Sequence, residues 1–435
     1  MRDFASKVPG LTSGQRTHDR AGRSRLEFAL GVALLVMSAN AFFPLLFGPK
    51  TIDADEVGWL RYLWLPVYAL TVFLAVWNWR DLRNAAPAFA PIFVLLALAA
   101  ASGLWSIDPQ ITLRRWEALA FNGLLAFYLA ARFSWTELVR LIAIAALLLA
   151  LGSLVMGLAF PSLGVQSDAN AGDWRGLWPQ KNELGFNMVI GVQACLATAL
   201  LDTKGRLWWI AGAALCVSLL ALSRSGTSLI CLMASGALLA GLSLSRKRPV
   251  GAIIAAFLAG CVALVLASVM ILDVNLLFQA IGKDPTLTGR TDVWAAVMRR
   301  VAERPVLGYG YGAFWTDRFG PALQVRREAG WDVPSAHNGW LDVLLQLGWT
   351  GVVMVAGYFA LTAAAAMRRL FSRSDGHWAA MYAVAFLILS LSESDILRQN
   401  SLEWILFVAA SAKLVIDLAS RPRLAPARLS VVRPA

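Results

Sequence analysis

His337 is the residue whose type and setting best fit a proton transfer. It precedes Asn338, a candidate N-cap, near the end of a polar stretch that runs from Thr288 to Thr350. The same stretch begins with Arg290, and a guanidinium presents a planar fork that fits diphosphate or carboxylate oxygens. A lone histidine is usually structural, but these neighbours favour a general base or a donor to a leaving diphosphate.

A second group of polar residues ends just before another apolar segment. Arg175, Trp178, Lys181 and Asn182 alternate there with other polar residues, so that two cations and two amides fall within eight residues. Cations and amides bond phosphates and hydroxyls, and tryptophan faces stack on sugar rings. An aromatic anchor at the membrane interface is the alternative, and we favour a binding site. Lys181 and Asn182 would also begin the next helix, where backbone amides favour anions.

Arg224 lies in a short turn between two apolar segments, within Ser223-Arg224-Ser225-Gly226. Its charge is therefore held at the edge of the membrane, where a charged residue is a candidate functional group. For any one arginine in such a position, snorkelling toward lipid headgroups is the alternative.

Glu393 and Asp395, together with Arg398, form an acidic group between the last two apolar segments. These carboxylates could pair with the arginines or serve as a second base. No His, Asp or Glu cluster in the sequence has metal-ligand spacing, so we expect no metal site and no cofactor.

The composition is typical of a polytopic membrane protein. Of the 435 residues, 58% are hydrophobic and 15% are charged, and the mean hydropathy is +0.61. Soluble domains are nearer half apolar and a quarter charged. The net charge of +12 does not indicate a nucleic-acid partner, because basic membrane proteins carry their Lys and Arg in cytoplasmic loops.

Twelve apolar segments are long enough to predict membrane-spanning helices, which need about 20 residues. They are 26–48, 58–78, 87–105, 113–131, 138–160, 183–201, 207–222, 226–243, 250–273, 349–367, 376–392 and 401–420. The sequence has no strand-like alternation, so helices are the spanning elements that we expect. The predicted fold is an all-α polytopic membrane protein with about 12 transmembrane helices and one long outer loop that carries amphipathic helices.

The positive-inside rule orients these segments. Twelve spans place both termini on one side, and most basic residues lie in inner loops when that side is cytoplasmic. The outer segments are then 49–57, 106–112, 161–182, 223–225, 274–348 and 393–400. Thirteen cations fall on the outer side or at outer helix ends: Arg114, Arg115, Arg175, Lys181, Arg224, Arg290, Arg299, Arg300, Arg304, Arg318, Arg326, Arg327 and Arg398. Such a face suits an anionic, lipid-linked substrate.

The long outer loop is predicted to begin with an amphipathic helix that ends at Pro305. Its apolar side chains recur at helical spacing. They are Val293, Trp294, Val297, Met298 and Val301.

The loop is predicted to continue with a tight turn and a short helix. Gly308, Gly310 and Gly312 alternate with two tyrosines, which favours a turn packed by aromatic side chains over a phosphate-binding fingerprint. A separate helix over 338–347 should precede the next span, with a break at Gly348 or Gly351, because one continuous helix would exceed the membrane core.

Six short motifs occur in order along the chain. They are Trp105-Ser106-Ile107-Asp108-Pro109, Lys181-Asn182-x-x-Gly185, Ser223-Arg224-Ser225, Gly289-Arg290-x-x-x-Trp294, Pro305-x-x-Gly308-x-Gly310 and His337-Asn338-x-x-Leu341. Over most of residues 90–360, their order and spacing resemble the O-antigen ligase and Wzy-type polymerase superfamily, and the first two motifs resemble its exopolysaccharide polymerase-like branch.

This resemblance implies an enzyme that transfers sugar chains from undecaprenyl diphosphate in the periplasm, without a metal or a nucleotide sugar. It implies Arg224, Arg290 and His337 as catalytic residues. The predicted substrate-binding residues are Arg175, Lys181, Asn182, Arg114, Arg115, Asn338, Trp178 and Glu393. We expect the arginines to hold the diphosphate and His337 or a carboxylate to deprotonate the acceptor hydroxyl, with inversion at the anomeric carbon.

Four functions remain open from the sequence. The first is a polymerase of exopolysaccharide or O-antigen repeat units. The second is a ligase that moves finished glycan to lipid A-core or to a protein. A flippase or other transporter is less favoured, because the predicted spans have few charges at their centres. A non-catalytic scaffold predicts that substitution of the outer cations has no effect on glycan assembly.

The predicted organisation has three parts. Residues 1–25 form a disordered basic cytoplasmic tail, 26–420 a transmembrane glycosyltransferase domain with the loop 274–348 inserted before the tenth span, and 421–435 a second cytoplasmic tail. We expect a bacterial inner-membrane protein whose active site faces the periplasm. Its expected partners are the undecaprenyl-diphosphate-linked oligosaccharide, the lipid bilayer and other polysaccharide-assembly proteins.

Overall fold

The structure, a computed structural model, describes residues 13–41, 46, 60–167, 170–245, 290–316, 320–370 and 377–419. Its longer helices are α1 (Ser13–Ser38), α3 (Leu65–Trp77), α5 (Ala90–Ala101), α6 (Pro109–Arg132), α7 (Trp135–Ala159), α9 (Lys181–Leu201), α10 (Arg206–Ser223), α11 (Gly226–Ser245), α14 (Arg290–Glu303), α16 (Gly339–Leu370), α17 (His377–Ser390) and α18 (Leu402–Ala419). The shorter ones are α4 (Trp79–Ala85), α8 (Pro161–Gly164) and α15 (Pro321–Ala329). Val165 and Trp174 form an isolated antiparallel bridge.

Five of the described helices are long and apolar enough to cross a membrane. They cover Trp79–Leu104, Trp135–Ala159, Lys181–Leu201, Arg206–Ser223 and Gly339–Arg369. Shorter apolar helices cover Tyr62–Trp77, Gly226–Leu238 and His377–Ser390. The predicted helical, multi-pass architecture is therefore supported, whereas the predicted span 250–273 lies outside the described residues.

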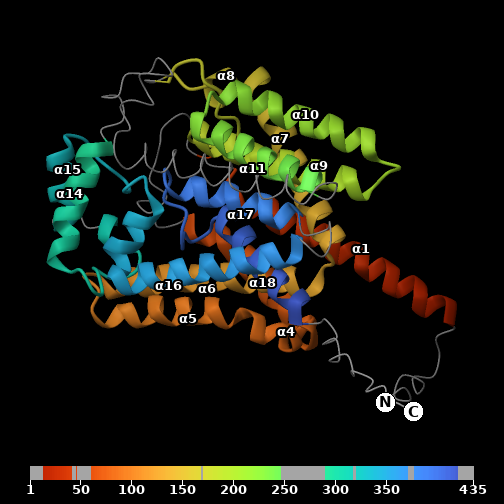
Figure 1. Cartoon of the computed structure of the whole chain (residues 1–435), viewed down its shortest axis with the longest axis horizontal. Coiled ribbons are helices and arrows are strands. Elements are labelled where there is room, and N and C mark those ends of the chain that lie inside the picture. Colours follow the sequence, from red (N-terminus) through yellow and green to blue (C-terminus); the bar gives the residue numbers. More distant parts are fainter. Residues whose placement is uncertain are drawn as a thin grey trace, which may run out of the picture.

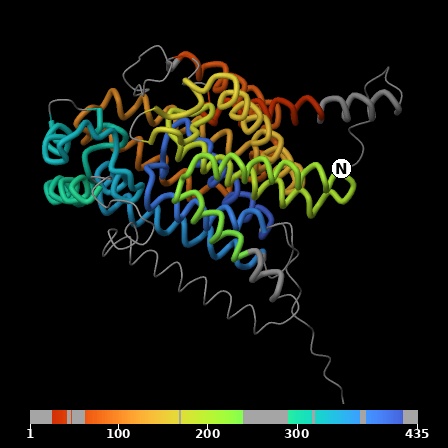
Figure 2. The backbone as a smooth tube through the Cα atoms, turned by 90° about the horizontal axis from the view of Figure 1, so that it is seen from above, coloured from red at the N-terminus to blue at the C-terminus, as the bar shows by residue number. Residues whose placement is uncertain are grey.

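The helices form a layered bundle around α17. This helix packs against α9, α11, α16 and α18, which is why most of its side chains are buried. In Figure 1, α7, α9 and α10 lie on one side of α17, and α5, α6 and α16 lie on the other. Figures 1 and 2 both place α14 and α15 at one end of the bundle.

The predicted outer segment 49–57 lies outside the described residues, and the described parts of the other outer segments meet at this end of the bundle. Segment 106–112 joins the long loop, since Ile107 N donates to Tyr309 O at 3.0 Å. The turn at Arg224 contacts Asp173 of the 161–182 segment. Glu393 contacts the long loop at Arg290. Segments far apart in the sequence thus form one continuous polar region.

The predicted break in α16 is confirmed at Gly348, whose backbone is non-helical with φ 62° and ψ −165°. A break exposes carbonyls on one side and N–H groups on the other, and both need partners. The loop Pro305–Gly312 supplies them. Tyr309 N donates to Leu345 O at 2.8 Å, and Trp349 N donates to Pro305 O at 2.8 Å. The loop therefore fixes the short helical segment that follows His337.

The glycine-rich part of this loop is the predicted aromatic turn. Gly308, Gly310 and Gly312 all have positive φ, and Tyr309 and Tyr311 are buried. A side chain at Gly310 would collide with Ser106. Glycine is thus required here for backbone geometry, as the aromatic-turn interpretation predicts.

One helix prediction needs correction. The sequence pattern places Met298 on the apolar stripe of α14, but it is exposed and Ala296 is buried instead, because the face that packs on α15 and α16 is narrower than the sequence pattern. Helix α1 begins at Ser13, within the segment 1–25 that the sequence predicts to be a cytoplasmic tail.

Candidate active site

Glu393 joins three of the predicted site residues. Its Oε1 atom accepts a hydrogen bond from Asn182 Nδ2 at 2.9 Å and lies 3.5 Å from a guanidinium nitrogen of Arg290. Its Oε2 atom lies 3.7 Å from His337 Nδ1. We call Glu393, Arg290, His337 and Asn182 the Glu393 cluster. They come from the 391–401 loop, α14, the turn before α16, and the first turn of α9.

The cluster keeps Glu393 ionised. Burial raises the pKa of Glu393, but the neighbouring His337, Arg290 and Asn182 together outweigh it and leave that pKa below its usual range. An ionised carboxylate facing Nδ1 favours the imidazole tautomer that carries its proton on Nδ1. The Nε2 atom of His337 then has a lone pair available to accept a proton.

The backbone of His337 is held in an uncommon conformation. Its φ is 48°, in the left-handed region that non-glycine residues seldom occupy. The preceding residue, Ala336, is held at both of its peptide groups: its N–H donates to Asp342 at 3.2 Å, and its carbonyl accepts from Trp294 Nε1 at 2.9 Å. Strained residues persist where several contacts fix them, and they cluster at active sites.

Two further contacts complete this turn. The predicted N-cap is confirmed, because Asn338 Oδ1 accepts from Trp340 N at 3.0 Å and from Leu341 N at 3.2 Å. The indole of Trp331 stacks on the imidazole of His337, with centroids 6.1 Å apart. Trp294, which bonds the neighbouring Ala336, lies on α14. The helix that carries Arg290 therefore also fixes the turn at His337.

Arg224 is a cation with a fixed backbone and an exposed side chain. Its φ is 48° at the C-cap of α10, and its side chain is 71% exposed. The guanidinium lies 3.4 Å from Asp173, which also pairs with Lys181 at 2.6 Å. Lys181 and Asn182 form the first turn of α9, as the sequence predicts.

A short chain of hydrogen bonds connects the Arg224 turn with the Glu393 cluster. Ser225 Oγ donates to Asn182 Oδ1 at 3.0 Å, and the amide of Asn182 donates to Glu393. A side chain at Gly185 would collide with Ser225 and Ser228. The Lys-Asn-x-x-Gly motif therefore lets the turn approach α9 closely, and this approach brings the two regions together.

The other predicted binding residues have different surroundings. Arg175 is buried and donates to Leu163 O at 2.8 Å. Trp178 is also buried, with Nε1 donating to Ala39 O at 2.7 Å. Arg115 donates to Gly312 O at 2.6 Å, whereas Arg114 is exposed on α6. These contacts give Arg175, Trp178 and Arg115 roles in holding loops together.

The structure adds two carboxylates, those of Glu183 and Glu403, that the sequence analysis did not single out. Glu183 lies within 4.0 Å of Arg398, whose closer partner is Asp395 at 2.9 Å. Burial is the main reason that the pKa of Asp395 rises to about 6, and Glu403 and Glu393 add to it against the opposing charge of Arg398. Glu183 and Glu403 stand in the first turns of α9 and α18. Carboxylates at the ends of apolar helices were the available signal.

The comparisons with known proteins agree with the motifs found in the sequence. Residues 209–356 match the O-Antigen ligase family. This range includes Arg224, Arg290 and His337. The chain is also 27% identical, over 409 residues, to the exopolysaccharide production protein ExoQ of Rhizobium meliloti, covering 89% of this chain and 88% of the relative.

The matched family and the relative agree with the prediction from the motifs. One is described as an O-antigen ligase and the other as an exopolysaccharide production protein. Both comparisons support the resemblance of this chain to the O-antigen ligase and Wzy-type polymerase superfamily.

Proposed function

We propose that this protein polymerises exopolysaccharide or O-antigen repeat units by glycosyl transfer from an undecaprenyl-diphosphate-linked donor. The observation that carries the proposal is the Glu393 cluster, in which one carboxylate lies within 3.7 Å of both His337 and Arg290. A base and a cation at one carboxylate are the two groups that such a transfer needs. The family match supports the same reaction class.

His337 is the proposed general base. Nδ1 of its imidazole faces Glu393 at 3.7 Å, so Nε2 accepts the proton of the acceptor hydroxyl. The acceptor oxygen then bonds to the anomeric carbon of the donor glycan. Glu393 stabilises the imidazolium that forms, as a carboxylate does in a catalytic triad. In this proposal the carboxylate acts through the histidine.

The outer cations are the proposed diphosphate site. As the bond between the anomeric carbon and the diphosphate breaks, the electron pair and the growing negative charge pass to the diphosphate. Arg290 lies at the Glu393 cluster, and Arg224 presents an exposed guanidinium. Preorganised cations at developing charge lower the barrier. Attack from the face opposite the diphosphate inverts the configuration, and neither step requires a metal ion.

The proposed topology follows the same reasoning. We propose about 12 spans, an inner-membrane location and a periplasmic site. The motif-bearing outer segments contact one another at one end of the bundle, which agrees with their predicted location on a single side of the membrane.

A ligase is the second candidate. Its acceptor would be lipid A-core or a protein, and the description of the matched family favours it. The relative that covers most of the chain is described as an exopolysaccharide production protein, and for that reason we prefer the polymerase. A flippase is the least favoured alternative.

The lipid-linked glycans of a deletion strain test the proposal. A polymerase predicts that single repeat units accumulate on undecaprenyl diphosphate and that polymer is lost. Full-length polymer that stays on the carrier would instead identify a ligase. Normal polymer in normal linkage would contradict both functions. Complementation with the wild-type gene is the control.

A further inference from the structure

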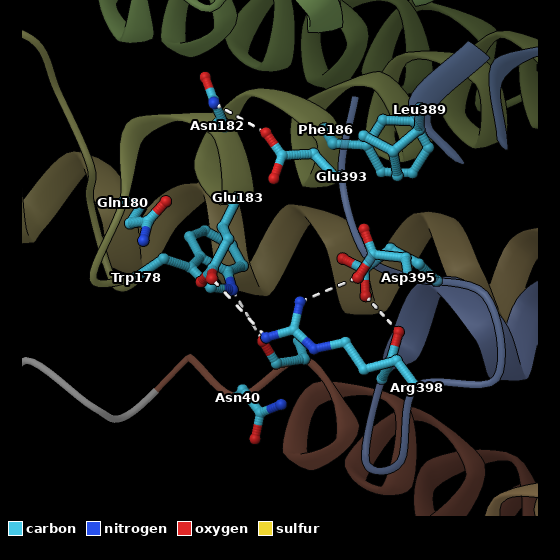
Figure 3. Close-up of a pocket in the computed structure, with 13 residues that line it drawn as sticks. Asn40, Trp178, Gln180, Asn182, Glu183, Phe186, Leu389, Glu393, Asp395 and Arg398 are labelled. Carbon is cyan, nitrogen blue, oxygen red and sulfur yellow. Dashed lines mark hydrogen bonds and ion pairs between the residues drawn. The ribbon is translucent and has the colours of Figure 1, made fainter. Parts of the chain in front are cut away.

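A cavity lies beside the Glu393 cluster. It is open on one side, and the empty space within it and its mouth is about 510 Å³. Its walls come from the end of α1, the segment before α9, and the loop between α17 and α18. Figure 3 shows Glu393 and Asn182 on one side of it and Arg398 between Glu183 and Asp395 on another. Glu393 therefore belongs both to the cavity wall and to the proposed catalytic cluster.

The charges lining the cavity are mainly negative. Four carboxylates line it, from Glu183, Glu393, Asp395 and Glu403, against the single guanidinium of Arg398. That guanidinium is already paired with Asp395 at 2.9 Å and lies 4.0 Å from Glu183. An anion that entered here would meet unfavourable charge.

The remaining polar lining is neutral and suits hydroxyl groups. Asn40, Gln180 and Asn182 contribute amides, which both donate and accept. Among the described residues, the side chain of Gln180 has no hydrogen-bond partner, and Figure 3 shows it at the cavity. Trp178 and Phe186 form part of the apolar wall. The amides and carboxylates can bond the hydroxyl groups of a sugar ring, and the apolar wall can pack against its C–H face.

The two arginines that suit a diphosphate, Arg224 and Arg290, lie outside the cavity. Arg224 projects into solvent beside Asp173, and Arg290 contacts Glu393 from α14. Neither Arg224 nor Arg290 is among the residues that line the cavity. The structure thus separates a cationic part from an acidic, amide-rich part, with the Glu393 carboxylate at their border.

We propose that this cavity binds the acceptor sugar as a neutral, hydroxyl-rich ring and disfavours acidic sugars. The proposal rests on the proposed glycosyl transfer and specifies its acceptor subsite. The Glu393 carboxylate lines the cavity and lies 3.7 Å from Nδ1 of His337. The acceptor hydroxyl can therefore approach the base while the donor diphosphate stays at the cations.

The test compares one glycan in two charge states. The repeat-unit oligosaccharide is prepared from the polymer of the producing cell, and a portion is oxidised so that its primary hydroxyls become carboxylates. Binding of each to the purified full-length protein in lipid nanodiscs is measured by equilibrium dialysis. We expect the oxidised form to bind about tenfold more weakly or worse, and high salt should reduce the difference.

Two substitutions at one position test whether the cavity causes this difference. Gln180→Glu should widen the ratio between the two forms, and Gln180→Lys should narrow it. The matched control is Asp332→Asn, which changes one exposed charge outside the cavity lining and should leave the ratio unchanged. Retained unfolding midpoints establish that all variants are folded.

The outcomes separate the inference from the function on which it rests. Equal or tighter binding of the oxidised form, or a ratio that is the same in both Gln180 variants, overturns the neutral-acceptor subsite. In that case transfer by the wild type, measured with the native lipid-linked repeat unit, still supports the proposed function. Failure of both oligosaccharides to bind, together with absent transfer, contradicts both proposals.

Discussion

The two ends of the helix bundle carry ion pairs of different kinds. At the end predicted to be cytoplasmic, Glu27 contacts Arg132 at 2.7 Å and accepts from Asn78 at 3.1 Å. We call these three residues the Glu27 cluster. At the opposite end of α6, the contacts of Glu393 with Arg290 and His337 measure 3.5 and 3.7 Å. The contacts of Glu27 are therefore shorter than those of Glu393, and the longer contacts leave hydrogen-bonding capacity at the Glu393 cluster.

The same contrast extends to neighbouring residues. Near the Glu27 cluster, Asp417 contacts Arg369 at 3.0 Å and accepts a hydrogen bond from Trp135, so three helices are joined through one carboxylate. At the other end, Arg224 has only a 3.4 Å contact with Asp173 and remains 71% exposed. We infer that the first end stabilises the fold and that the second binds substrate. Four predictions test this contrast, from the largest effect to the smallest.

Replacing His337 should have the largest effect on activity. His337→Ala removes the proposed base, and we expect the rate of glycosyl transfer to fall about 100-fold or more. Purified protein and native lipid-linked repeat units provide the assay. His377→Asn, at the start of α17, should keep the wild-type rate per folded molecule. A His337→Ala protein that is folded and fully active would exclude the base assignment.

Replacing one arginine at each end should give opposite results. Arg224→Ala should reduce the transfer rate about tenfold to 100-fold and leave the unfolding midpoint unchanged, because its guanidinium is exposed. Arg132→Ala leaves the buried Glu27 without its cation, and we expect a loss of about 1–3 kcal/mol in stability at a normal rate per folded molecule. A normal transfer rate in Arg224→Ala, together with a reduced rate per folded molecule in Arg132→Ala, would contradict the roles inferred for the two ends.

Trp294→Phe should have a smaller effect that is specific to the His337 turn. It removes the hydrogen bond to Ala336 O, so the turn loses one of its restraints. We expect kcat to fall about 3–10-fold with little change in KM, alongside a stability loss of about 1 kcal/mol. Trp116→Phe removes an equivalent 2.9 Å bond to Leu96 O. A similar fall in kcat in this control would show that the effect is not local.

The smallest expected effect is on the pH dependence of stability. The pKa of Asp395 is raised to about 6 in the folded protein, so the folded state binds more protons than the unfolded state between about pH 4 and 6. Stability should therefore fall as pH rises through this window. The charge of Arg398 opposes this rise in the pKa of Asp395, whereas Glu403 and Glu393 add to it. Asp395→Asn should flatten the slope of the unfolding midpoint against pH, and an unchanged slope would contradict the assignment.

Local patterns were sufficient to predict the helices and several of their ends. Apolar runs predicted α7, α9 and α10 to within a few residues, and chain length against membrane thickness predicted the break at Gly348. These features depend on residues close together in the sequence. Arg224 and His337 could be selected as candidates for the same reason, because each follows from its neighbours and the predicted side of the membrane.

The connections between the candidates depend on contacts that no local pattern contains. The left-handed backbone of His337 follows Ala336, whose peptide groups are bonded to Trp294 and Asp342. The role of Glu393 depends on α9 and α14, which approach it only in the folded bundle. The acidic cavity was missed because Glu183 lies in the first turn of an apolar helix, far in sequence from its partner Arg398.

The rate of glycosyl transfer by Glu393→Gln tests the central claim most directly. Gln keeps the size of the side chain but removes the charge that orients His337 and contacts Arg290. Because the pKa of Glu393 is below its usual range, the wild-type side chain is ionised at pH 7, where the two rates are compared. We predict a rate per folded molecule at least about tenfold lower, whereas Glu27→Gln should keep the wild-type rate per folded molecule. A Glu393→Gln protein that transfers glycan at the wild-type rate would contradict the account.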